Sequence, residues 1–211
     1  MAHIVLVRHA QSEWNALGRW QGWADPPLTE LGRSQAELAG VRLSSLAHGH
    51  RQGPPPRLVV SSDLQRASTT ASIVADRALP HATPRTDPDW REYRVGAWSG
   101  LTRAEIEHQW PGELDRWDRG DLLAPPGGEH RAHFEARLVK ALGRVAADTG
   151  ETGAALVVSH GGAIRSLSRR FRTPVDHIGN LAGVVLTGSA GRFRQVDTID
   201  LLGGSDLPAA D

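Results

Sequence analysis

Two histidines and two arginines occupy positions from which they could handle a phosphoryl group together. Arg8 and His9 follow directly after a short apolar run. Arg66 comes shortly after a second run, and His160 and Gly161 follow a third. Arginine offers a planar fork of charged donors that suits phosphate, and the first amides of a helix bind anions. An imidazole can also accept a phosphoryl group covalently. If the three runs converge, they predict a phosphoryl site with a nucleophile inside it.

A metal site and a serine hydrolase are the two alternatives to a phosphoryl site. A metal site is disfavoured because the chain has no His-Glu-x-x-His motif and no acidic cluster at ligand spacing. A serine hydrolase is disfavoured because there is no Gly-x-Ser-x-Gly elbow, and Ser159 precedes a histidine instead of standing on its own turn. The chain has no cysteine, so a thiolate nucleophile is excluded. We expect neither a metal nor another cofactor.

The charge balance argues against large anionic partners. Lys+Arg and Asp+Glu both number 24, so no overall positive field would hold the chain on nucleic acid or an anionic membrane. Lys140 is the only lysine, so the other 23 basic residues are arginines. The apolar run at residues 4–7 is too short for a signal peptide core or a membrane span. We expect a cytoplasmic protein that binds a small phosphomonoester through local charge.

The three apolar runs, at residues 3–7, 57–61 and 154–159, predict the centre of a parallel sheet. They lack polar alternation, which is typical of strands buried on both faces. Ligands bind beyond the carboxyl ends of such strands, so the residues that follow each run should meet at one edge of the sheet. This arrangement would bring the histidines and arginines together.

Helices are predicted between the runs. Thr29 can cap a helix to about Leu46, and Asp63 can cap another to about Ala78. Residues 129–147 form a long amphipathic candidate. This alternation predicts an α/β fold, a three-layer sandwich with a central, mostly parallel sheet flanked by helices.

The end of the chain predicts antiparallel edge strands. Residues 182–187 and 192–196 are strand-like and are separated by a glycine-bounded turn at 188–191. We expect one domain over residues 1–202, with a helical excursion at about 101–128 and a frayed tail at 203–211. Residues 48–56 are expected to form a surface loop. The pattern leaves a monomer and a homodimer equally open.

Several motifs, in matching order, resemble the histidine phosphatase superfamily in its phosphoglycerate mutase branch. They include Leu-Val-Arg-His before Ala10 and Ser-His-Gly-Gly at residues 159–162. The matching segments are residues 6–15, 19–22, 25–29, 61–71, 91–100, 127–129 and 158–165. The resemblance spans about residues 4–196 and implies a metal-independent reaction through a phosphohistidine. In this family the residue after the nucleophilic histidine is usually glycine, so Ala10 departs from the pattern.

The resemblance also implies a role for individual residues. His9 would be the nucleophile, and Glu92 would protonate the leaving group and later activate water. Arg8, Arg66 and a charged His160 nearby would favour the neutral form of His9. The residues implied to bind phosphate are Arg8, Arg66, His160, Asn15 and Gly161. The residues implied to bind the rest of the substrate are Gln21, Gly22 and Ser12.

Three functions are compatible with these motifs. Hydrolysis of a sugar phosphate or a phosphoglycerate-type monoester is favoured, because Tyr93 follows Glu92 where mutases of the family carry arginine. Only 67 residues separate Glu92 from His160, which leaves no room for the longer mutase insertion. A cofactor-dependent phosphoglycerate mutase is the first alternative. A non-catalytic phosphate-binding or phosphoprotein-binding module is the second, although binding alone requires neither a nucleophile nor an acid.

The substrate itself is not identified by these patterns. A carboxylate on it would suit a phosphoglycerate-type compound, and three arginines near the motifs are candidates to bind that carboxylate. They are Arg19, Arg94 and Arg103.

Overall fold

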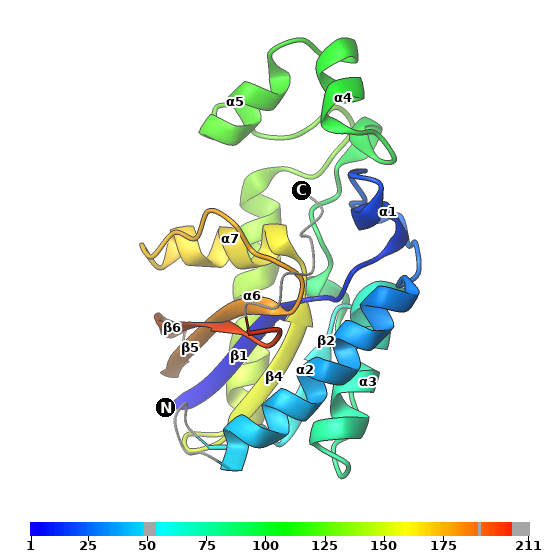
Figure 1. Cartoon of the computed structure of the whole chain (residues 1–211). Coiled ribbons are helices and arrows are strands. Elements are labelled where there is room, and N and C mark those ends of the chain that lie inside the picture. Colours follow the sequence, from blue (N-terminus) through cyan, green and yellow to red (C-terminus); the bar gives the residue numbers. More distant parts are fainter. Residues whose placement is uncertain (49–53, 190, 204–211) are drawn as a thin grey trace.

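The computed structural model describes residues 1–48, 54–189 and 191–203, which form a six-stranded mixed sheet between two layers of helices (Figure 1). The strand order is β3-β2-β4-β1-β5-β6. The strands are β1 (Ala2–Arg8), β2 (Leu58–Ser61), β3 (Arg85–Thr86), β4 (Ala154–Ser159), β5 (Ala182–Ser189) and β6 (Arg192–Asp200).

The three apolar runs are neighbours in the middle of this sheet, as predicted. β4 pairs in parallel with β1 on one side and with β2 on the other. Every residue of β4 is buried. Because the three strands run in the same direction, their carboxyl ends lie at one edge, where the polar residues follow.

The later strands are antiparallel, which confirms the mixed sheet. β5 pairs antiparallel with β1, and β6 pairs antiparallel with β5 at the edge. β6 continues to Asp200, four residues beyond the predicted end. The turn predicted at 188–191 contains residue 190, which lies outside the described residues.

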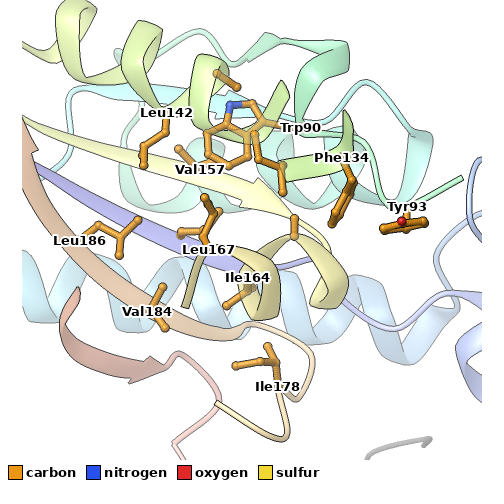
Figure 2. Packing of buried hydrophobic residues seen from close by; sticks show 14 of the residues in the cluster. Trp90, Tyr93, Phe134, Leu142, Val157, Ile164, Leu167, Ile178, Val184 and Leu186 are labelled. Carbon is orange, nitrogen blue, oxygen red and sulfur yellow. The ribbon is translucent and has the colours of Figure 1, made fainter. Parts of the chain in front are cut away.

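Helices cover both faces of the sheet, as the three-layer prediction requires. One face carries α2 (Glu30–His48) and α3 (Gln65–Ala78), and the other carries α6 (Arg131–Thr149) and α7 (Gly161–Arg170). Small residues of α2, Ala36 and Ala39, let it pack closely on the first face. On the second face, Figure 2 shows Leu142, Val157 and Leu167 packed together from α6, β4 and α7.

Two predicted helix starts differ from the structure. Asp63 does not cap α3, whose N-cap is Leu64, because both Asp63 carboxylate oxygens accept hydrogen bonds from Arg91 at 2.7 and 2.6 Å. A two-bond ion pair competes well with a single bond to a helix amide. α6 begins at Arg131, two residues after the predicted start, and its N-cap is His130, whose side chain accepts a hydrogen bond from Ala132 N at 3.2 Å. The predicted Thr29 cap is present, since its hydroxyl accepts a hydrogen bond from Gly32 N at 2.9 Å.

Short elements carry the chain over the strand ends. They are α1 (Glu13–Ala16), the 3-10 turns η1 (Pro88–Trp90) and η2 (Gly96–Trp98), α4 (Arg103–Gln109) and α5 (Glu113–Arg119). α4 and α5 lie away from the sheet at the top of Figure 1. Aromatic side chains tie this region to the core, since Trp117 meets both Tyr93 and Trp98 edge to face.

Some predictions fall on residues that are not described. Residues 49–53 of the predicted 48–56 loop and residues 204–211 of the predicted tail lie outside the described part. Among the described helices, none combines the length and the apolar character needed to cross a membrane.

Candidate active site

The ends of β1 and β4 bring His9 and His160 together. The His9 amide donates to Ser159 O at 2.9 Å, which fixes the end of β1 against the residue before His160. The two imidazole rings lie 5.1 Å apart between centroids and are inclined by 65°. Both are buried, with 3% and 1% of their surface exposed. They lie in a cavity of about 820 Å³ that Arg8, Arg66 and Glu92 also line.

A backbone hydrogen bond selects the tautomer of His9. Its Nδ1 lies 2.7 Å from Ala10 O. A carbonyl oxygen only accepts hydrogen bonds, so Nδ1 must carry the proton. The neutral ring then has its lone pair on Nε2, which is the form required of a nucleophile.

The surroundings keep both imidazoles uncharged. Burial, then Arg66 and Arg8, hold the pKa of His9 well below its usual range. Burial, then Arg66 and His9, lower the pKa of His160 in the same way. The expectation of a charged His160 is therefore wrong for the free site, because a buried imidazole among guanidinium groups loses its proton at neutral pH.

Arg8 and Arg66 are held by carbonyl groups. Arg8 donates to Ile178 O at 2.8 Å, and Arg66 donates to Ala24 O and Gly22 O at 2.7 and 2.8 Å. Burial lowers the pKa of each to about 10, so both stay charged at neutral pH. Arg66 also forms a long ion pair with Asp25, whose carboxylate lies 3.9 Å from Nη1 and is 44% exposed. The carbonyls carry no net charge, so much of the positive charge of the two arginines remains available to an anion.

Buried polar atoms around His9 lack partners within the described structure. They are both ring nitrogens of His160 and Nε of Arg66. An unpaired buried polar group costs roughly 1–3 kcal/mol. An anion would relieve part of this cost, since the Nε–H of Arg66 and the single N–H of a neutral imidazole both donate to oxygen.

Glu92 faces the same cavity from the segment between η1 and η2. Its carboxylate accepts hydrogen bonds from Tyr93 N at 2.7 Å and from Gly162 N, in the first turn of α7, at 2.9 Å. Neither Arg91 nor Arg94 pairs with it: Arg91 binds Asp63, and Arg94 lies over the Trp23 ring. The carboxylate thus lines the cavity with His9 and forms no ion pair with either of these arginines.

Arg137 of α6 holds the backbone that carries Glu92. It donates to the carbonyls of Asp89, Arg91 and Glu92 at 2.7–2.8 Å. Its remaining two bonds go to Glu129, both at 2.9 Å. All five guanidinium donors are therefore occupied. The patterns in the sequence did not point to this residue, since one arginine on an amphipathic helix is an ordinary surface residue.

The other predicted residues take different places around the cavity. Asn15, Gln21, Gly22 and Gly161 line it. Ser12 does not: its fully buried hydroxyl lies 3.1 Å from Asn15 Oδ1 and 3.0 Å from Gln21 Oε1, which share its single proton. With its oxygen bonded to Ser12, Asn15 can offer its amide N–H groups to a ligand.

The extra methyl group of Ala10 does not reach the cavity. Ala10 is fully buried, packs in the cluster beneath α2 and α3, and donates its amide to the Thr70 hydroxyl at 3.1 Å. The departure from the usual glycine therefore leaves the cavity lining unchanged.

Two of the three arginines considered for a carboxylate are paired with acids. Arg19 binds Glu105 at 3.1 Å, and Arg103 binds Asp118 at 2.7 Å. Arg94 is not among the residues that line the cavity.

Asn180 was also missed by the sequence patterns. It donates to His9 O at 2.9 Å from the loop before β5, where its position could not be read from the chain order. Within the described residues, no three His, Asp or Glu side chains cluster so as to hold a metal ion.

Comparisons with known proteins agree with this geometry. Residues 4–194 match the family model of the histidine phosphatase superfamily (branch 1). A glucosyl-3-phosphoglycerate phosphatase of Mycobacterium tuberculosis is 37% identical over 189 residues, which cover 86% of this chain and 80% of that protein. A 2,3-bisphosphoglycerate-dependent phosphoglycerate mutase of Methylocella silvestris is 35% identical over 167 residues, which cover 78% of each.

The fold of a solved relative agrees as well. The structure of mycobacterial glucosyl-3-phosphoglycerate phosphatase in complex with VO3 superposes with a TM-score of 0.79 and 34% identity. The match covers 92% of this chain and 97% of that one. This chain therefore belongs to the histidine phosphatase superfamily, in its branch 1.

Proposed function

We propose that this protein is a phosphatase that hydrolyses a small phosphomonoester through a phosphohistidine formed on Nε2 of His9. The observation that carries the proposal is the bond from Nδ1 of His9 to Ala10 O, which leaves an unprotonated nitrogen beside two charged arginines. This is the state that an attacking imidazole requires, and it is present without substrate.

The reaction proceeds in two displacements. Nε2 attacks phosphorus as the bond to the ester oxygen breaks, and Glu92 in its protonated form gives its proton to that oxygen. The Glu92 carboxylate then takes a proton from a water molecule, which attacks the phosphohistidine and releases phosphate. Arg8 and Arg66 stabilise the charge on the phosphoryl oxygens in both transition states. Asn15, His160 and Gly161 line the same cavity, and we assign them the same oxygens.

Hydrolysis is favoured over phosphoryl return to a bound product. The chain has no adjacent arginine pair between Trp98 and Lys140 to retain a bisphosphate, and Tyr93 follows Glu92. The mutase alternative is supported by the name of the Methylocella relative, and the phosphatase reading by the name of the mycobacterial one. A phosphoglycerate-type or sugar-linked monoester is the substrate class that we propose.

Phosphate release and covalent labelling together test this function. 3-Phosphoglycerate, glucosyl-3-phosphoglycerate and p-nitrophenyl phosphate would be incubated with the wild-type protein and with His9→Ala, and mutase product would be measured in parallel. We expect the wild type to release phosphate and His9→Ala to lose at least a thousandfold in rate. Label from ³²P-substrate should appear on the wild type as an alkali-stable, acid-labile adduct. Turnover by His9→Ala at the wild-type rate would refute the proposal.

A further inference from the structure

We propose that Arg165 and Arg169 of α7 form a second anion subsite, which selects phosphomonoesters that also carry a carboxylate. The inference rests on the proposed phosphatase function and names the substrate class of the same cavity. Both residues line that cavity, and neither guanidinium group forms a hydrogen bond or an ion pair within the described structure. They differ in this respect from Arg19, Arg103 and Arg170, which line the cavity but are paired.

The position of Arg165 places the subsite next to the phosphoryl group. A Cβ atom at Gly161 would lie 3.4 Å from Nη1 of Arg165 and 3.7 Å from Cδ of Arg8. Arg165 thus folds back over the start of α7 beside an arginine of the phosphoryl site. Arg169 follows four residues later on the same helix face, so the two side chains are neighbours. The subsite extends from the phosphoryl group outward along α7.

The electrostatics show that these three cations repel one another. Burial and then Arg165 lower the pKa of Arg8 to about 10. Burial and then Arg165 also lower the pKa of Arg169. Arg165 therefore repels the arginines on either side of it. Like charges four residues apart on a helix are destabilising, and an anion between them would reverse that effect.

The acidic residues of the cavity do not supply that anion. Asp118 pairs with Arg103 and Glu135 with Arg170. Glu135 also faces Arg169, where it offsets part of the repulsion. The Glu92 carboxylate is bound by two backbone amides, and Asp176 is exposed. These acids therefore leave Arg165 without an ion-pair partner, and an anionic ligand can supply one.

A carboxylate fits these groups better than a hydroxyl does. A guanidinium binds both oxygens of a carboxylate with two parallel hydrogen bonds, and such charge-assisted bonds are about twice as strong as neutral ones. In a phosphoglycerate the carboxylate lies three carbons from the ester oxygen at most. Arg165 and Arg169 line the same cavity as His9, and Arg165 adjoins Arg8, so a carboxylate at this separation from the phosphoryl group is within the span of the proposed subsite.

A matched pair of substrates tests the subsite. 3-Phosphoglycerate and glycerol 1-phosphate share a three-carbon skeleton, and only the first has a carboxylate. We expect the wild type to prefer 3-phosphoglycerate in kcat/KM by about 10- to 100-fold. Arg165→Gln should remove most of this preference by lowering kcat/KM for 3-phosphoglycerate alone. Arg169→Gln should have a smaller effect of the same kind, and Arg165→Lys should be intermediate because it keeps the charge but loses the fork.

The control variant is Arg85→Gln. Arg85 lies on β3, outside the cavity, and forms an exposed ion pair with Asp148. The variant should leave both substrates unaffected. The subsite would be overturned if Arg165→Gln and Arg165→Lys lowered kcat/KM equally for both substrates, or if the wild type showed no preference. The phosphatase function would stand in either case. Release of phosphate from neither substrate by the wild type would instead count against the function itself.

Discussion

His9 and Glu92 divide the chemistry between them, so their replacements should have different effects. Glu92→Gln removes the proton that an alkoxide leaving group needs, whereas p-nitrophenolate leaves without one. We expect kcat for an alkyl phosphate to fall by about 100-fold or more, within the range of general acid catalysis, and kcat for p-nitrophenyl phosphate to fall far less. Steady-state assays of both substrates check this. Equal slowing of the two would remove Glu92 from the acid role.

Gly162 is a second residue that affects the catalytic acid, because a larger side chain here would displace the Glu92 carboxylate. A Cβ atom at this position would lie 2.2 Å from Oε1 of Glu92, so the carboxylate must move if a methyl group is added. Gly162→Ala should therefore slow alkyl phosphates by about tenfold or more and spare aryl phosphates.

Gly143→Ala is the matched control for this change. Gly143 lies inside α6 with open space around it, so alanine there should stabilise the protein by up to about 1 kcal/mol without changing kcat. If Gly162→Ala kept full activity on alkyl phosphates, the close contact with Glu92 would be irrelevant to catalysis.

At the scale of elements, α6 positions the acid from a distance. The segment that carries Glu92 is neither helix nor strand and depends on Arg137, whose guanidinium donates to the carbonyls of Asp89, Arg91 and Glu92. Arg137→Lys retains the charge but cannot make five bonds. We expect it to lower kcat for alkyl phosphates about tenfold, with little change in KM, and to affect aryl phosphates less.

A double-mutant cycle separates this positioning role from a general loss of stability. If Arg137 acts through Glu92, adding Arg137→Lys to Glu92→Gln should slow alkyl phosphates little further. Independent, additive effects in the two backgrounds would show that Arg137 supports the fold alone.

The sequence predicted the elements whose pattern is local. The unbroken apolar runs identified β1, β2 and β4, and their shared direction placed His9, Arg66 and His160 at one edge of the sheet. Arg137 and Asn180 were not predicted, because each acts on a backbone carbonyl far away in the chain. The prediction that Asp63 caps α3 was wrong for the same reason, since its ion-pair partner Arg91 is distant in the sequence and is brought next to it only by folding.

For the molecule as a whole, the two buried imidazoles should make stability depend on pH. Their pKa values are lowered in the folded state, so below about pH 6.5 the unfolded chain takes up protons that the folded chain refuses. The free energy of unfolding should therefore fall on acidification from pH 7.5 to 5.5, by at most about 1.4 kcal/mol per group for each pH unit below 6.5. Urea denaturation in buffers without phosphate or sulfate measures this, and the double variant His9→Asn, His160→Asn should lose most of the slope. An unchanged slope in that variant would mean that other groups carry the dependence and that the site does not hold both rings neutral.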